Sequence, residues 1–205
     1  MLADGLDQLG ITASALQIHQ WQAYIDLLVK WNKAYNLTAV RDKNAMIHRH
    51  LLDSLSVASH ITSQSLLDVG AGAGLPSIPL AILWSDRAIT ALDSNGKKTR
   101  FMQQVKAELK LSNFTVVHSR VEDYRPTHLF DGITARAYAT LADIVSSSGH
   151  LLTPPGTIWA MKGQIDPDEL SALPKPYKVT ACLPLCVPGG DAERHLVVIQ
   201  PSLIT

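Results

Sequence analysis

The stretch LLDVGAGAGLP, residues 66–76, decides the fold. Its apolar start has the continuous hydrophobicity of a strand that is buried on both faces. Three alternate glycines, Gly70, Gly72 and Gly74, then permit a tight turn and let a ligand approach the backbone at the start of a helix. Because open α/β sheets bind ligands at the carboxyl ends of their strands, this turn is a candidate binding loop.

The chain after residue 65 alternates short β-rich runs with longer amphipathic runs, which predicts a mainly parallel sheet with helices on both faces. The β-rich runs are SLLDV, AITAL, FTVVH, DGITA, TIWAM, KVTACLPL and HLVVIQ. Only VPGGDAER separates the last two runs, so they form a hairpin and one of them runs antiparallel to the rest. We therefore expect an α/β, Rossmann-like sheet of about seven strands.

The first part of the chain has a helical pattern instead. Between residues 12 and 60 apolar side chains recur near a 3.6-residue period, and they predict helices that are separated by the polar segment at residues 36–38. The apolar face of the first helix contains Leu16, Trp21, Ile25, Leu28 and Trp31. We divide the chain into a helical N-terminal cap, residues 1–62, and a Rossmann-like domain, residues 63–205.

Composition is that of a globular protein. Of the 205 residues, 46% are hydrophobic and 18% are charged, and no apolar run reaches the length that a bilayer span needs. The N-terminus MLADGLDQLG has no signal-peptide pattern, so we expect a cytoplasmic protein without membrane attachment. The two cysteines, Cys182 and Cys186, are expected to be reduced, half-buried thiols, and a redox pair is the alternative.

The net charge is zero, which argues against a protein that coats nucleic acid without specificity. The charges are nevertheless clustered. A basic stretch in the cap contains Arg41, Lys43 and Arg49, and a second one spans residues 97–110. Two interpretations stay open for these clusters, namely docking on RNA and solvated helix faces.

The glycine spacing distinguishes between nucleotide cofactors. Dinucleotide-binding loops favour glycine-x-glycine-x-x-glycine, but here Gly74 comes one position early and Leu75 stands where glycine is wanted. This tighter spacing suits S-adenosylmethionine, which has no pyrophosphate. At the end of the second strand Asp93 can accept hydrogen bonds from both ribose hydroxyls. The alternative role for Asp93 is a helix N-cap, which Ser94 or Asn95 could supply equally well.

Two further strand ends point into the same crevice. Val121 and Glu122 follow the third strand, where a backbone N–H and a carboxyl group can face an adenine ring, although Glu122 could equally cap a helix or form an ion pair. Arg136 ends the fourth strand, where its guanidinium can meet the cofactor's carboxylate or a substrate phosphate. An ion pair with Asp131 or Glu122 is its alternative. Asp68 either steadies the glycine turn or meets the cofactor's ammonium group.

With these residues in place, nearly the whole chain resembles a known family, the bacterial 16S ribosomal RNA guanine-N7 methyltransferases, formerly called glucose-inhibited division protein B. The specific segments are KWNKAYNLT at residues 30–38, RHLLDS at residues 49–54 and the loop at residues 68–79. ERHL at residues 193–196 also looks like a family segment. Ser77 departs from the pattern, because the family often has a further glycine there, and we expect slightly altered packing at this position.

The resemblance implies a class I methyltransferase fold with S-adenosylmethionine as cofactor. The cofactor-binding residues would be Gly70, Leu75, Val121, Glu122 and Arg136, together with Asp93. The implied partner is 16S rRNA or the small ribosomal subunit, and we expect a monomeric enzyme.

The chemistry implied by the family needs little from side chains. Guanine nitrogen-7 carries an in-plane lone pair and no proton, so we expect no general base and no metal, and we assign no catalytic residue. Lys162, after the fifth strand, and Arg194, near the hairpin, are candidates for RNA contact together with Arg41, Lys43 and Arg49. A solvated surface charge is the alternative for each of them.

Two other functions remain open from the sequence. One is a methyltransferase that acts on a small molecule or a protein, which the basic cap disfavours and which a methylation assay on total RNA would separate. The other is a non-catalytic RNA-binding protein on the same scaffold, which the intact glycine loop and Asp93 disfavour.

Overall fold

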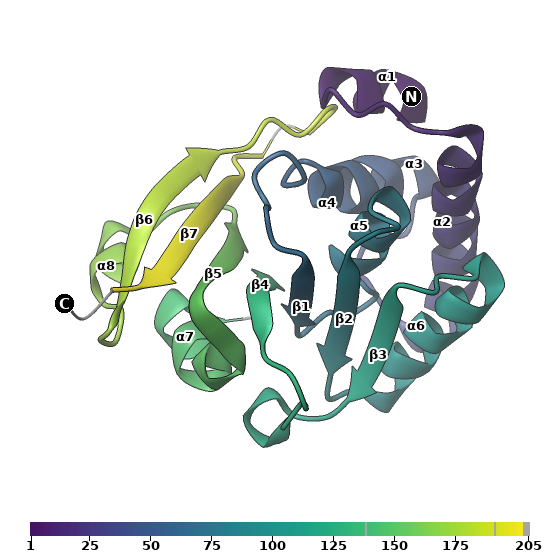
Figure 1. The fold of residues 1–205 in the computed structure, drawn as a ribbon. Coiled ribbons are helices and arrows are strands. Elements are labelled where there is room, and N and C mark those ends of the chain that lie inside the picture. Colours follow the sequence, from purple (N-terminus) through teal and green to yellow (C-terminus); the bar gives the residue numbers. More distant parts are fainter. Residues whose placement is uncertain (138, 191, 203–205) are drawn as a thin grey trace.

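A single mixed sheet forms the centre of the molecule (Figure 1), and the computed structural model describes residues 1–137, 139–190 and 192–202 of the chain. Its seven strands are β1 (Ser65–Val69), β2 (Ala88–Asp93), β3 (Phe114–His118), β4 (Phe130–Arg136), β5 (Leu152–Lys162), β6 (Tyr177–Pro184) and β7 (His195–Pro201). They are arranged in the order β3-β2-β1-β4-β5-β7-β6. Strands β1 to β5 are parallel, whereas β7 runs antiparallel to both of its neighbours. The expected sheet with a terminal hairpin is confirmed.

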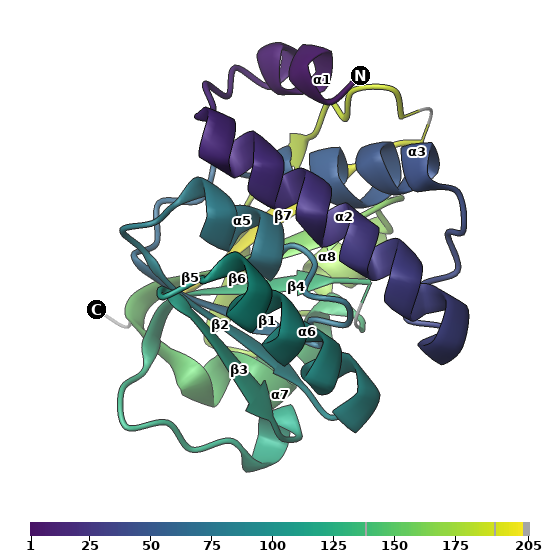
Figure 2. The same cartoon turned by 90° about the vertical axis from the view of Figure 1, so that its right-hand side faces the viewer.

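Helices cover both faces of this sheet (Figures 1 and 2). They are α1 (Leu2–Gln8), α2 (Ala15–Tyr35), α3 (Lys43–Met46), α4 (Asp53–Leu55), α5 (Ser77–Leu83), α6 (Gly96–Leu109), α7 (Leu141–Ser148) and α8 (Pro167–Ser171). A π-helical segment, Ile47–Leu52, joins α3 to α4. Such wide turns are rare in proteins, and those that occur are often found at functional sites.

Local sequence explains both ends of the long cap helix α2. Ser14 accepts a hydrogen bond from the backbone N–H of Gln17, and the Gln17 side chain accepts one from the backbone N–H of Ser14, which is a capping box. The helix ends at Asn36, whose φ of 51° lies in the left-handed region that asparagine tolerates. The predicted helix is therefore bounded by signals of its own.

The expected buried face of α2 is confirmed at its three central members, whereas Trp31 is only partly buried and the first member is exposed. Trp21, Ile25 and Leu28 are buried, but Leu16 is 66% exposed. Five residues separate Leu16 from Trp21, which places the two side chains roughly 140° apart around the helix. Gln17 occupies the inward position instead, and its side-chain amide donates to two backbone carbonyls at the end of α5.

The core is divided by the sheet into two clusters. One contains cap residues such as Trp21 and Tyr24 together with Phe101 from α6 and Ile78 from α5. The other lies on the opposite face, where α7 packs against β1, β4 and β5. The cap therefore shares a continuous core with the sheet and is held against its α5–α6 face.

The prediction of half-buried cysteines is wrong. Cys182 and Cys186 are both free and exposed. Burial alternates strictly along β6, which is the edge strand of the sheet and has one face open to solvent. Cys182 falls on that open face, and Cys186 follows the strand. Within the part of the chain that the structure describes, every helix is too short or too polar to cross a membrane.

Candidate cofactor and nucleotide site

The glycine loop connects β1 to α5 by an unusual backbone path. Gly70, Gly72 and Gly74 have φ values of 66°, 61° and 82°, all in the left-handed region where glycine is favoured. The N–H of Gly72 donates to Asp93 at 2.8 Å, and the N–H of Gly74 donates to the Ala71 carbonyl at 2.8 Å. These two N–H groups are therefore used within the protein, and the glycines are needed for the path of the backbone.

The cap supports the glycine loop from behind. The hydroxyl of Tyr24 donates to the Ala73 carbonyl at 2.9 Å, and the indole N–H of Trp21 donates to the Pro79 carbonyl at 3.2 Å. Both aromatic side chains are fully buried, and burial raises the pKa of the Tyr24 hydroxyl far above its ordinary value. Tyr24 thus remains a neutral donor that fixes the loop, a role that the sequence pattern did not reveal.

Asp93 holds the glycine loop and faces the crevice at the same time. Its Oδ2 accepts from Gly72 at 2.8 Å, its Oδ1 accepts from the backbone N–H of Asn95 at 2.8 Å, and Lys98 Nζ lies 3.9 Å away. The N-cap of α6 is Asn95, which excludes the alternative cap role for Asp93. Each carboxylate oxygen retains a second lone pair for a ligand hydroxyl.

Asp68 is a buried carboxyl group beneath the loop. Its Oδ2 accepts from the backbone N–H of Ser77 at 3.2 Å, and its Oδ1 accepts from the Thr134 hydroxyl at 3.4 Å. Burial raises the pKa of Asp68 to about 6, while these hydrogen bonds oppose the shift. Of its two possible roles, the structure shows the steadying of the glycine turn. The buried hydroxyl of Ser77 has no hydrogen-bond partner among the described residues.

A cleft of about 350 Å³ opens beside the loop, at the carboxyl ends of β1, β2 and β3. Its lining residues are Gly70, Leu92, Asp93, Ser94, Lys98, Ser119, Arg120, Val121, Glu122 and Ala137. Four of the expected cofactor residues, Gly70, Asp93, Val121 and Glu122, therefore come together in one cleft. Gly72, Gly74 and Leu75 shape the loop behind it, and Arg136 lies in the neighbouring hollow.

The donors and acceptors of this cleft fit an adenosyl cofactor. Asp93 offers carboxylate oxygens at the end of β2, where ribose hydroxyls bind in related sheets. Val121 and Glu122 begin a short 3₁₀ turn at the end of β3 and offer an apolar side chain and a carboxylate beside it. Polar and apolar groups are thus arranged for a sugar and an aromatic base.

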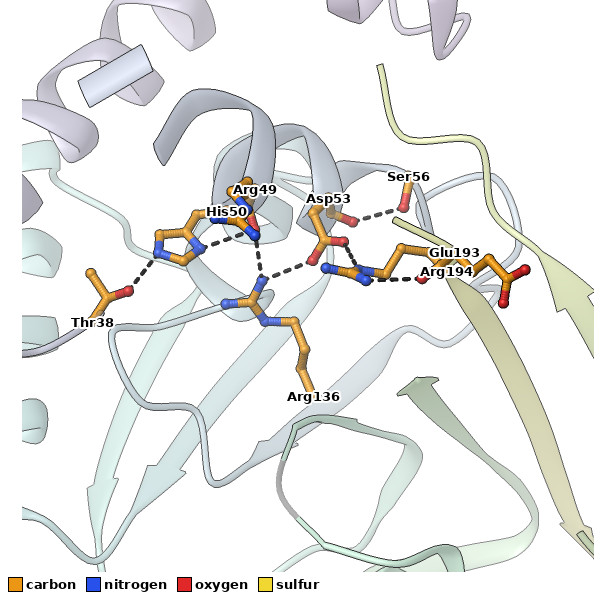
Figure 3. A network of polar contacts seen from close by, with 8 residues as sticks. All are labelled: Thr38, Arg49, His50, Asp53, Ser56, Arg136, Glu193 and Arg194. Carbon is orange, nitrogen blue, oxygen red and sulfur yellow. Dashed lines mark hydrogen bonds and ion pairs between the residues drawn. The ribbon is translucent and has the colours of Figure 1, made fainter. Parts of the chain in front are cut away.

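Arg136 and Arg194 share one buried carboxylate (Figure 3). Asp53, at the start of α4, accepts from Arg136 Nη1 and from Arg194 Nε, both at 2.8 Å. The Asp53 side chain is 4% exposed, and Arg136 Nη1 also donates to the Arg49 carbonyl at 3.3 Å. Arg136 therefore pairs with Asp53 and not with Asp131 or Glu122, which the sequence offered as alternative partners. The cap, the end of β4 and the residue just before β7 meet at this carboxylate.

A second hollow of about 370 Å³ adjoins the cofactor cleft at Ala137, which lines both. Its lining residues are Asp53, Arg136, Ala137, Met161, Lys162, Gly163 and Arg194. Lys162 forms an ion pair with Glu169 at 2.8 Å, and neither side chain is more than about a fifth exposed. The solvated-charge alternative therefore fails for Lys162 and Arg194, since both are partly buried and paired.

His50 is a buried neutral histidine next to this hollow. Its Nε2 lies 2.7 Å from the Thr38 hydroxyl and its Nδ1 lies 3.0 Å from the Arg49 carbonyl. Burial, and then the charge of Arg136, lower the pKa of His50 to about 4. Nδ1–H therefore donates to the carbonyl and Nε2 accepts from Thr38, which orders the family segment at residues 30–38.

The three candidate RNA-contact cations of the cap differ in their interaction partners. Arg41 donates to the Asn32 carbonyl at 3.3 Å and to the Asn36 side chain at 2.7 Å. Lys43 pairs with Asp26 on the surface, and Arg49 is exposed. Arg41 and Lys43 are therefore occupied on the cap surface, whereas Arg49 lines a further hollow that also contains Asp53 and Arg194.

The fold and the site together define a class I, S-adenosylmethionine-dependent methyltransferase. The family model described as rRNA small subunit methyltransferase G matches residues 17–197, so the chain belongs to this family (GidB). A ribosomal RNA small subunit methyltransferase G from Pseudomonas paraeruginosa is 52% identical over 200 residues, covering 97% of this chain and 94% of the relative. One from Ectopseudomonas mendocina is 52% identical over 204 residues, covering 98% of this chain and 95% of the relative.

Solved structures support the fold at much lower identity. The glycopeptide N-methyltransferase MtfA in complex with S-adenosyl-L-homocysteine has a TM-score of 0.64 at 14% identity, covering 75% of this chain and 87% of MtfA. TrmN from Thermus thermophilus has a TM-score of 0.55 at 18% identity, covering 73% of this chain and 47% of TrmN. The family assignment and this fold agree, and the chain is an S-adenosylmethionine-dependent rRNA methyltransferase.

Proposed function

We propose that this protein transfers a methyl group from S-adenosylmethionine to nitrogen-7 of a guanine in 16S rRNA. The observation that carries the proposal is the junction at Ala137. A cleft suited to an adenosyl group and a hollow lined by three cations and one carboxylate meet at that residue. One hollow is suited to the methyl donor, and the other is suited to an anionic nucleotide.

The cofactor would lie among the residues of the cleft. Asp93 would accept hydrogen bonds from the ribose, Val121 and Glu122 would contact the adenine, and Gly70 would form the wall beside the sulfonium. When bound, S-adenosylmethionine supplies a methyl group on a positively charged sulfur. Arg136, at the border between the two hollows, would orient the cofactor's carboxylate or a substrate phosphate.

The chain's own residues act by positioning. Nitrogen-7 has a free lone pair and loses no proton, so a base is unnecessary and alignment is the main contribution, worth roughly 7–11 kcal/mol when well arranged. His50 stays neutral and hydrogen bonded, which is consistent with a structural role. Arg194 and Lys162 supply the positive charge that receives the RNA backbone, and Arg49 extends it toward the cap.

The two parts of the chain would have separate binding roles. The cap, residues 1–62, would dock on RNA through Arg41, Lys43 and Arg49, and residues 63–205 would bind the cofactor. We propose a monomeric, cytoplasmic enzyme that acts on 16S rRNA within or outside the small subunit. Arg41→Glu with Lys43→Glu should weaken RNA binding and its salt dependence without changing S-adenosylmethionine affinity, since counterion release acts only on phosphate contacts.

The chemical test uses two modified 16S transcripts. In one, 7-deazaguanine replaces guanine, which removes the attacking lone pair and preserves the Watson–Crick edge. In the matched control, 7-deazaadenine replaces adenine. We expect the enzyme to bind both transcripts but to transfer a methyl group only to the control. The rate of methylation of normal RNA should show no dependence on the ionisation of a general base between about pH 6 and 9. Methyl transfer to the 7-deazaguanine transcript at the normal rate would exclude nitrogen-7 as the acceptor.

A further inference from the structure

A groove outside the two hollows is lined by α6, by the edge strand β3 and by one residue of α2. Helices α2 and α6 run side by side over one face of the sheet (Figure 2). The groove has a volume of about 500 Å³. Its lining residues, which we call the Trp31 groove, are Trp31, Thr99, Arg100, Gln103, Gln104, Val116 and His118. None of them lines the cofactor cleft, but His118 Nε2 lies 3.0 Å from the carbonyl of Ser94, which does. The groove therefore borders the cofactor cleft at the β3 edge.

The aromatic part of the groove is held in a fixed position. The Trp31 ring is partly exposed and packs on Tyr35 at 5.2 Å and on Phe101 at 5.6 Å between ring centroids. A ring held in this way can contact a base at low cost in conformational entropy. Stacking on aromatic side chains is the usual mode by which proteins hold unpaired bases.

The polar lining complements a nucleic acid strand. Among the residues that the structure describes, no aspartate or glutamate lines the groove, whereas the side chains of Arg100 and His118 are exposed within it. The amides of Gln103 and Gln104 stand on the exposed side of α6 and offer both donors and acceptors to base edges. Glu108 lies outside this lining and accepts from the Gln104 amide at 2.6 Å.

Both helices that contribute to the groove carry further exposed cations. Lys30 and Lys33 lie on α2, and Lys97 precedes Arg100 by one turn on α6. In the part of the chain that the structure describes, none of these four side chains forms an ion pair. The chain as a whole is neutral, so this excess of positive charge is local. It is the charge pattern that binds phosphates.

We propose that the Trp31 groove is a second RNA-binding site, which holds a single-stranded segment of the substrate by stacking on Trp31 and by a phosphate contact to Arg100. This inference rests on the proposed function. Strands β3 and β4 are three positions apart, so the groove and the basic hollow at Arg136 are separated by roughly 14 Å across the sheet. A few nucleotides of extended RNA span that distance, and gripping them keeps the target guanine unstacked.

The test measures binding of an oligouridylate of about twelve nucleotides, a length within the range that single-strand binding sites cover. Arg100→Glu should weaken binding about tenfold at low salt and reduce the slope of log affinity against log salt by about one. The matched control is Lys178→Glu, the same charge change on the exposed side of the opposite edge strand, which should have little effect. Trp31→Phe keeps a ring against Phe101 and should remove the fluorescence quenching that the oligonucleotide causes.

Folding and function are followed separately. Thermal melting and S-adenosylmethionine affinity should be the same in Arg100→Glu and Lys178→Glu, and with the 16S transcript Arg100→Glu should raise KM without lowering kcat. The groove assignment is wrong if Arg100→Glu binds the oligonucleotide like the wild type and the fluorescence of Trp31→Phe is quenched as in the wild type. If methylation proceeds normally in these variants, the proposed function stands. If the wild type binds through Arg100 but methylates no guanine in 16S rRNA, the function is wrong and the groove stands.

Discussion

The shared carboxylate of Asp53 predicts a large and measurable effect of the substitution Asp53→Asn. The amide preserves volume and one acceptor oxygen but removes the charge that both arginines contact at 2.8 Å. Two charge-assisted hydrogen bonds are worth about 1.5–3 kcal/mol each. The side chains of Arg136 and Arg194 are 19% and 30% exposed, so water partly compensates them after the change. We therefore expect a loss of about 2–4 kcal/mol in the free energy of unfolding.

Equilibrium unfolding in urea, followed by circular dichroism, measures this loss. A domain of this size should also melt roughly 5–15 °C lower. The matched control is Asp26→Asn, which breaks the surface pair with Lys43, where both side chains are at least half exposed, and should cost at most about 1 kcal/mol. Methyl transfer to 16S rRNA should fall in Asp53→Asn, because both arginines lose their orientation. A loss of stability no larger than that of Asp26→Asn would refute the assignment of Asp53 as the link between cap and sheet.

Three other predictions concern the cofactor loop. Gly72→Val should abolish S-adenosylmethionine binding in a folded protein, because a β-branched residue is strained at a φ of 61° although the space around it is open, and unchanged affinity by calorimetry would show that the loop is not the site. Asp93→Ala should weaken that affinity by about ten- to a hundredfold, since it removes the ribose acceptor and the partner of the Gly72 N–H, whereas wild-type affinity would leave Asp93 as a loop anchor only. The pKa of Asp68 is raised to about 6 from 3.8, so this carboxyl group favours the folded state most below about pH 4, and that contribution is lost as the pH rises through 6. Asp68→Asn should therefore gain stability relative to the wild type between pH 4.5 and 7, by up to about 3 kcal/mol in urea unfolding, and a difference that is independent of pH would contradict the burial argument.

Much of the fold could be predicted because its signals are local. The alternation of β-rich and helical runs predicted all seven strands, and the short segment between β6 and β7 predicted their hairpin. The exceptions are residues whose surroundings depend on distant elements. Leu16 obeys the helical period only approximately and is exposed, and Cys182 lies on the exposed side of β6.

The cofactor cleft was predictable for the same reason. Gly70 and Asp93 follow two parallel strands, and the carboxyl ends of parallel strands meet at one edge of the sheet. What the loop needs from the rest of the molecule was not visible. Tyr24 supports it from a helix 49 residues earlier in the chain, and no periodicity marks that hydrogen bond.

The sequence by itself determined the strands, the glycine turn and the class of cofactor, since each depends on residues that are neighbours in the chain. Tertiary structure alone decided the partners of the charged side chains. Arg136 and Arg194 lie 83 and 141 residues from Asp53, and any of several acids could have paired with them. An ion pair is set by which elements the packed core brings together, and the strength of the pair depends on burial. Neither quantity exists until the cap has packed against the sheet.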